Sequence, residues 1–226
     1  MLLKSNFDMQ DLGEANVIFG MKISRTSNGI FVDQSHYIKK KKNEKKYNYF
    51  DCKPASIRFN SNVHLFPTKD ENDIHNQKEY ANIIGSLRYA IDCTRPDIAD
   101  AVGVLAKFTS KPNFEHWNAM TQLMGYLKRT VHYGLLYQRY PAVFEGYSDV
   151  SWNTLLGDSL STTSYVFTIG GGAISWKSKK QQIIAKSTME VELIALSLAS
   201  EEAGWLRDLL SKIPMWEKPI SPVLIH

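Results

Sequence analysis

The spacing of hydrophobic positions in the first part of the chain predicts a hairpin followed by helices. Asn28-Gly29 separates two apolar runs within residues 17–34, and this dipeptide between apolar runs is a strong signal for a β-hairpin. The polar, irregular stretch 56–78 predicts a connecting loop. Apolar residues then recur every three or four positions, which predicts three helices with apolar packing faces, in the segments 79–91, 94–108 and 113–130.

From about residue 143 the pattern changes to the shorter period of β-strands. Three consecutive strands with polar or glycine-rich turns are expected, in "VFEGYSDVSW", "TSYVFTIGG" and "GAISWKSKKQQIIA". A long helix follows from Ser187 until Pro214 stops it, and the final "SPVLIH" predicts the start of another strand. The expected fold class is α/β, α+β overall, with a helical segment followed by a mixed sheet and one long helix.

Composition narrows the class of protein. With 226 residues and 43% hydrophobic content, the chain suits one large globular unit or two small ones. It has no apolar run long enough to span a bilayer, and its start lacks the apolar core of a signal peptide. Two cysteines, Cys52 and Cys93, are too few for a disulfide framework or a zinc site. We therefore expect a reducing intracellular setting, in the cytoplasm or the nucleus, and no membrane partner.

The charge is distributed unevenly along the chain. Residues 1–60 carry eleven Lys/Arg and six Asp/Glu, whereas residues 141–226 carry seven and nine. The strongest basic feature lies in the first part, where six lysines fall within eight residues: Lys39, Lys40, Lys41, Lys42, Lys45 and Lys46. We expect a short basic helix that ends before Pro54. Such a run forms either a solvated charged face or a nucleic-acid contact, since neutralising phosphates needs clustered lysines and no special geometry.

The long C-terminal helix separates the roles of two glutamates. Ser187 and Glu190 have the spacing of a capping box, so Glu190 is expected to have a structural role. Glu192 instead heads an apolar stripe by helical spacing, which continues through Leu196, Ala199, Ala203, Leu206 and Leu210. A carboxylate at the head of a buried stripe needs compensation. It is either an acid favoured by the helix start or a ligand.

Asp149 lies within the first of the three strands and adds to the pattern. An acid on a strand, two further antiparallel strands and an acid on a helix is the layout of a divalent-metal site at one edge of a mixed sheet. Hard cations such as Mg²⁺ prefer oxygen ligands. Two-metal phosphodiester hydrolysis needs several carboxylates, however, and Asp149 and Glu192 are only two.

Several stretches together resemble one known family. They are "DLGEANVIFGMKI", "GIFVDQSHYI", "FDCKP", "YANIIGSLRYAIDCTRPDIADAVGVLAKFTSKPNFEHWNA", "YLKRTVHYGLLY", "GYSDVSW", "GGAISWKSKKQ" and "STMEVELIALSLASEEAGWLRDLL". In this order and spacing the sequence resembles the C-terminal part of the Pol polyprotein of copia-type LTR retrotransposons. The resemblance extends over nearly the whole chain.

The resemblance implies two domains and a nuclease chemistry. Residues 1–140 resemble the thumb and connection segment at the end of a reverse transcriptase, and residues 141–226 resemble the first half of an RNase H domain. In that family RNase H cuts the RNA strand of an RNA–DNA hybrid, with Mg²⁺ held by acidic residues. Asp149 matches the first of these acids, and Glu192 matches the helix glutamate. The expected partner is thus an RNA–DNA hybrid or another nucleic acid.

Departures from the family pattern favour an inactive chain. Ser151 stands where relatives have a second aspartate, and Met189 and Leu193 replace residues of the helix motif. The family supplies its third metal ligand after the position of His226, and the polymerase aspartates before Met1. We therefore expect a truncated copy without nuclease or polymerase activity that retains nucleic-acid binding. The alternatives are an active Mg²⁺-dependent RNase H-type endonuclease using Asp149 and Glu192, and an inert fragment.

Overall fold

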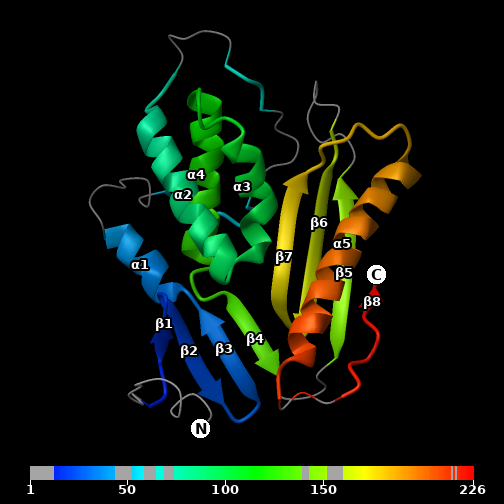
Figure 1. The fold of residues 1–226 in the computed structure, drawn as a ribbon. Coiled ribbons are helices and arrows are strands. Elements are labelled where there is room, and N and C mark those ends of the chain that lie inside the picture. Colours follow the sequence, from blue (N-terminus) through cyan, green and yellow to red (C-terminus); the bar gives the residue numbers. More distant parts are fainter. Residues whose placement is uncertain are drawn as a thin grey trace, which may run out of the picture.

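The computed structural model of the chain is an α+β fold, as the sequence predicts (Figure 1). It describes residues 13–43, 52–58, 65–68, 74–138, 143–151, 160–214, 216 and 218–226, with the side chains of 40–43 left out. Two four-stranded sheets have the orders β1-β2-β3-β4 and β7-β6-β5-β8. We call them the N-terminal and the C-terminal sheet.

The N-terminal sheet begins with the predicted hairpin. Strands β2 (Met21–Thr26) and β3 (Gly29–Asp33) are antiparallel, and Thr26 pairs with Gly29 across a two-residue turn. Strand β1 (Val17–Ile18) pairs with β2. The fourth strand, β4 (Gly134–Gln138), comes from a point about a hundred residues later and pairs with β3. The sequence pattern did not indicate β4, because its five residues show no alternation of apolar and polar side chains.

Helices make up most of the described chain between β3 and β4. Helix α1 (Ser35–Asn43) follows β3, and α2 (Gln77–Cys93), the 3₁₀ turn η3 (Pro96–Ile98), α3 (Ala99–Ala106) and α4 (Phe114–Arg129) form a packed group. The predicted apolar stripes are confirmed as packing faces. Residues from all of these helices and Leu65 share one hydrophobic core, in which Tyr80, Ile98, Leu105, Met120 and Leu123 are fully buried.

A buried arginine joins the ends of two of these helices. Arg95 is 0% exposed and donates from Nε and Nη2 to the two carboxylate oxygens of Asp97, at 2.8 Å each. It also donates to the carbonyl and the hydroxyl of Thr130, at 3.1 and 2.7 Å. The rings of Tyr126 and Tyr133 lie 5.7 Å from its guanidinium carbon. Burial raises the pKa of Asp97, but hydrogen bonds from Arg95 and its charge outweigh that effect and hold the pKa below its ordinary value.

The C-terminal sheet follows the predicted strand order. Strands β5 (Phe144–Ser151), β6 (Thr162–Ile169) and β7 (Gly172–Lys180) are antiparallel neighbours. Helix α5 (Thr188–Ser211) crosses one face of this sheet (Figure 1), and the short strand β8 (Leu224–Ile225) returns parallel to β5. A second hydrophobic core forms between sheet and helix, from Tyr165, Phe167, Ala199, Ala203 and Leu206.

The two sheets and the helical group are in contact. The backbone N–H of Gln138, at the end of β4, donates to the carbonyl of Gly170 at 2.8 Å. The Tyr137 hydroxyl donates to the carbonyl of Ala173 at 2.7 Å, and the Trp176 indole donates to the carbonyl of Ile91 at 3.0 Å. The β6–β7 turn and β7 itself therefore pack against β4 and the end of α2. In the described part of the chain, no helix is long and apolar enough to cross a membrane.

We predict that Arg95→Ala lowers the free energy of unfolding by about 3 kcal/mol, because it leaves the partly buried Asp97 carboxylate and the Thr130 oxygens without their donor. Urea unfolding followed by circular dichroism measures the loss. The matched control is Arg88→Ala, which removes an exposed arginine of α2 and should cost less than about 0.5 kcal/mol. Equal effects of the two substitutions would contradict a structural role for Arg95.

The same network predicts a pH dependence of stability. The pKa of Asp97 is lower in the folded than in the unfolded protein. The contribution of Asp97 to the free energy of unfolding is therefore present above the unfolded pKa of about 3.9 and is lost as the pH falls through the folded pKa. Asp97→Asn should therefore remove part of the acid-side loss of stability. An unchanged acid-side slope of the unfolding free energy would show that Asp97 has no depressed pKa.

Candidate functional site

Asp149 lies in β5 with its side chain exposed. It pairs with Ser164 of β6, whose hydroxyl donates to the Asp149 backbone carbonyl at 3.4 Å. On the same strand, Gly146 faces the α5 side, because a Cβ there would collide with the ring of Phe167. Side chains alternate between the two faces of a strand. Asp149 therefore stands on the face of the sheet opposite the one that α5 covers.

An aromatic stack that the sequence analysis did not anticipate lies beside Asp149. The rings of Tyr147 and His226 are 5.1 Å apart and inclined by 20°. His226 is held next to β5 by two backbone hydrogen bonds of 2.9 Å, to the Gly146 carbonyl and from the Ser148 N–H. The nearby charge of Glu145, with a smaller effect of burial, raises the pKa of Tyr147. Side chains alternate along a strand, so Tyr147 and Asp149, two residues apart, lie on the same face of β5. This spacing is the one sign of the neighbouring ring that the sequence contains.

Glu192 lies in the second turn of α5 and is exposed. The predicted stripe is buried from Ala199 to Leu210, but its first two positions, Glu192 and Leu196, are exposed, so the expectation was wrong at its head. The buried residues at this end of α5 are Val191, Ala195 and Ala199, whereas Leu196 is 44% exposed. Ala199 follows Glu192 by seven residues, a rotation of two full helical turns less about 20°. Both side chains therefore lie on the same side of α5. Figure 1 gives the reason for the exposure, because α5 begins beyond the β5 side of the sheet.

Glu190 has the structural role that the sequence predicts. The Ser187 hydroxyl accepts from the Glu190 N–H at 3.2 Å, and the Glu190 carboxylate accepts from the N–H of Lys186 at 2.7 Å. The carboxylate thus reaches one residue further back than a standard capping box requires. Glu190 is engaged in this helix cap, so it is Glu192 that remains as a candidate ligand.

The structure places Asp149 and Glu192 at the same end of the C-terminal sheet, with Asp149 on the face away from α5 and Glu192 on α5 itself. Strand β5 ends and α5 begins at the upper end in Figure 1. In the part of the chain that the structure describes, no hydrogen bond joins the two carboxylates, and no group of three or more His, Cys, Asp or Glu side chains could hold a metal ion. Two carboxylates fit Mg²⁺ in their chemistry, since this ion is bound through one or two carboxylates with several waters. They do not make a two-metal centre.

The lysine run is described only in part. Helix α1 includes Lys39 to Lys42, which confirms the expected basic helix as far as Asn43. Lys39 is exposed, next to the buried Ile38 that anchors the helix to the core. The side chains of Lys40, Lys41 and Lys42 and the whole of Lys45 and Lys46 lie outside the described residues. Helix α1 lies on the opposite side of the helical group from the C-terminal sheet (Figure 1).

No protein-family model matches the chain, but it is similar to several known proteins. It is 38% identical over 223 residues to the retrovirus-related Pol polyprotein from transposon TNT 1-94 of Nicotiana tabacum, covering 96% of this chain and 17% of that protein. The retrovirus-related Pol polyprotein from transposon RE1 of Arabidopsis thaliana is 29% identical over 212 residues, covering 93% of this chain and 14% of its own length. The chain thus spans less than a fifth of either polyprotein.

A third relative is not described as a Pol polyprotein. The secreted RxLR effector protein 161 of Plasmopara viticola is 44% identical over 128 residues, covering 56% of this chain and 90% of that protein. The two polyproteins match almost the whole chain, so both the helical group and the C-terminal sheet lie within the shared region.

Proposed function

Because the chain is homologous over nearly its whole length to a region of the retrovirus-related Pol polyproteins of transposons, we propose that it binds nucleic acid without hydrolysing it. In this proposal residues 1–140 are the end of a reverse transcriptase, of the copia type, and residues 141–226 are an RNase H-like unit. Activities and partners of the polyproteins are assigned to this chain only within this proposal.

One observation carries the assignment of the C-terminal part. Three antiparallel strands, a helix across one face and a fourth strand parallel to the first form a single unit. An exposed carboxylate on the first strand and another on the helix lie at one end of that unit, Asp149 and Glu192. This arrangement agrees with the family resemblance of both residues, which was drawn from the sequence alone.

The number of ligands supports the absence of hydrolysis. If a magnesium ion bound here, Asp149 and Glu192 would hold it, and it would supply activation of water or stabilisation of the leaving oxygen. Two-metal hydrolysis needs carboxylates on both ions, and the described residues bring no third acid, histidine or cysteine to the pair. Ser151, two residues after Asp149 on β5, offers a hydroxyl where a further carboxylate would be required.

The charge of the first part supports binding. Residues 1–60 have five more basic than acidic residues. Four lysines lie in one short helix, which the buried residue Ile38 anchors to the core. Lysines that contact phosphates release bound counterions, and this provides affinity for any nucleic acid without sequence preference.

The first test is cleavage. Purified protein is incubated with a labelled RNA–DNA hybrid and Mg²⁺, beside Asp149→Asn and Glu192→Gln variants and a hydrolase of known activity. We expect the RNA strand to remain uncut in the presence of the wild type and of both variants, because two carboxylates do not hold two metal ions. Cleavage by the wild type that Asp149→Asn abolishes would establish the alternative, an RNase H-type endonuclease.

The second test is the salt dependence of binding to the same hybrid, followed by fluorescence anisotropy. Replacing Lys39 to Lys42 by Ala should lower the affinity and reduce the slope of log K against log salt by about 0.7–0.9 per lost phosphate contact. The control replaces four exposed lysines elsewhere by Ala, namely Lys78, Lys186, Lys212 and Lys218. Equal slopes in both variants would contradict binding through α1.

A further inference from the structure

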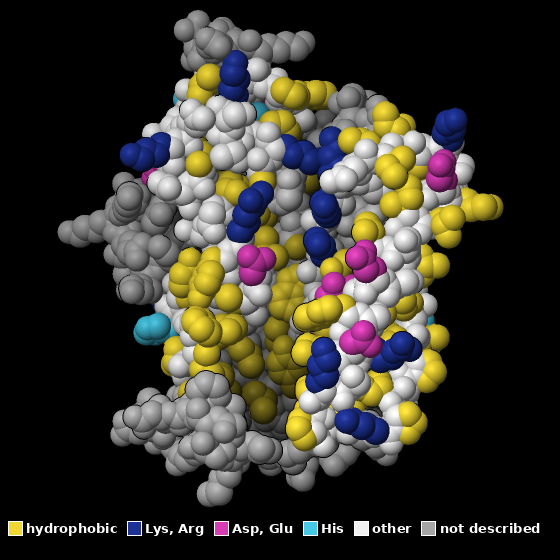
Figure 2. Space-filling view, in the orientation of Figure 1, with side chains coloured by type: hydrophobic (Ala, Val, Ile, Leu, Met, Phe, Trp, Pro, Cys, Tyr) yellow, Lys and Arg dark blue, Asp and Glu magenta, His cyan; other side chains and the backbone are white. Residues whose placement is uncertain are grey.

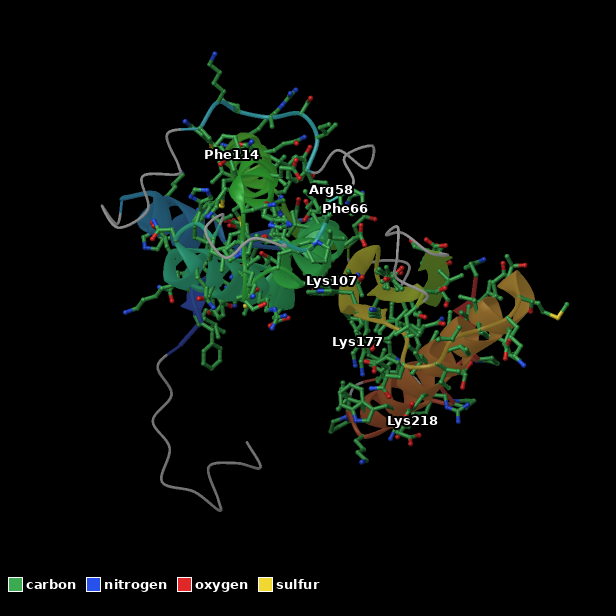
Figure 3. The ribbon with its side chains drawn as sticks, turned by 90° about the horizontal axis from the view of Figure 1, so that it is seen from above. Arg58, Phe66, Lys107, Phe114, Lys177 and Lys218 are labelled. Atoms are coloured by element: carbon green, nitrogen blue, oxygen red, sulfur yellow. The ribbon has the colours of Figure 1, made fainter. Side chains whose placement is uncertain are left out.

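A groove of about 740 Å³ lies between α5 and the strands β6 and β7. One wall belongs to β7 and the segment after it, the other to α5. In Figure 2, Lys and Arg side chains gather over β7, between the helical group and α5. Figure 3 shows Lys177, a residue of this groove, beside α5 on the side toward the helical group. Neither Asp149, Glu192 nor α1 lines the groove, so it is separate from the site described above.

The wall from α5 has an apolar stripe of its own. Ile194, Leu198 and Trp205 line the groove, and Leu198 and Trp205 are 40% and 59% exposed. They are distinct from the residues of α5 that pack on the sheet, among them Ala199, Ala203 and Leu206. Eleven residues from Ile194 to Trp205 extend about 16 Å, or three helical turns. A helix with a second exposed apolar stripe of this length offers a seam to another helix.

The opposite wall is basic. Lys177 and Lys179 are exposed and line the groove. They are on the same face of β7 as Ser175, whose hydroxyl donates to the carboxylate of Glu202 on α5 at 2.6 Å. Glu201 and Glu202 line the α5 side. The apolar stripe is therefore flanked by positive charge on one side and by carboxylates on the other.

A buried acceptor also belongs to the groove. Gln181 lines it and is only 5% exposed. Its amide nitrogen donates to the Thr163 hydroxyl and to the Val191 carbonyl. Its carbonyl oxygen has no partner among the described residues. Buried polar atoms normally have a hydrogen-bond partner, so Gln181 is an unsatisfied polar position in the wall of the groove.

We propose that this groove binds an amphipathic helix of a protein partner. The apolar face of that helix packs on Leu198 and Trp205, and an acidic flank faces Lys177 and Lys179. Helices that lie in hydrophobic grooves are recognised in this way, by apolar anchors spaced at i, i+3, i+4 and i+7. The carboxylates of Glu201 and Glu202 on the α5 wall favour this occupant over a nucleic acid, because they repel phosphates, whereas a helix with one acidic flank turns that flank toward the lysines.

The probe is a labelled synthetic helical peptide of three to four turns, with leucines on one face and glutamates along one flank. Its matched control has lysines in place of the glutamates. Fluorescence anisotropy should show the acidic peptide binding at least about tenfold more tightly than the basic one. The variant Lys177→Glu/Lys179→Glu should reverse this preference. Leu198→Asp should weaken binding of the acidic peptide by at least about tenfold.

Two controls separate loss of the groove from loss of the fold. Leu193→Asp changes an exposed leucine of α5 that does not line the groove and should leave binding unchanged, and all variants should keep the wild-type melting temperature. Equal binding of both peptides, or binding that Leu198→Asp leaves intact, would overturn the proposal. The proposal would also be overturned if an RNA strand bound in the groove, and if that binding were lost in Lys177→Glu/Lys179→Glu but kept in Leu198→Asp. These outcomes leave the hybrid-binding proposal untouched, since α1 is unchanged in every variant.

Discussion

The position of the buried Arg95 guanidinium constrains the rest of this structure. A charge that is fully removed from water is costly unless it is paired and hydrogen-bonded, and Arg95 satisfies that requirement with Asp97 and Thr130. The pairing fixes the start of η3 against the end of α4. Strand β4 begins only four residues after Thr130, so the same pairing fixes where the chain leaves the helical group and enters the N-terminal sheet.

Strand β4 then determines how the C-terminal sheet is placed. It pairs with β3 on one side, and its Tyr137 and Gln138 contact the β6–β7 turn and the start of β7. Gly172 permits this approach, because a Cβ there would collide with the ring of Tyr137. The indole of Trp176 adds a hydrogen bond to the end of α2. The two hydrophobic cores are thus separate, but the elements that surround them share β4 and β7 as a junction.

Much of this fold can be predicted from the spacing of apolar residues, because local periodicity specifies helices and strands directly. The hairpin around Asn28-Gly29, the helices from 79 to 130, the strands β5 to β7 and helix α5 were all indicated in this way. Strand β4 was not, since a short strand paired with a partner a hundred residues away leaves little local signal. The burial of Glu192 was also mispredicted. Helical spacing gives the side of the helix on which a residue lies, but it does not tell where the sheet ends beneath that helix.

The candidate site shows the same limit of sequence-based inference. The sequence identified Asp149 and Glu192 and distinguished Glu192 from the capping residue Glu190, and the structure brings both to one end of the C-terminal sheet. Neither the Tyr147–His226 stack nor the groove beside α5 could be inferred, because each depends on side chains that meet only in the folded chain. The function we propose rests on this partial site, which has the ligand chemistry of a magnesium site without its ligand number.

The most direct test of this account is the binding of Mn²⁺, which prefers oxygen ligands as Mg²⁺ does, measured by the electron paramagnetic resonance signal of the free ion. With millimolar ion, we predict that the wild type binds at most one Mn²⁺ per chain more than an Asp149→Asn/Glu192→Gln double variant, because two carboxylates can hold one ion but not two. A loss of two Mn²⁺ ions per chain with the wild type that the double variant abolishes would contradict the account, because it would show that a two-metal centre is present.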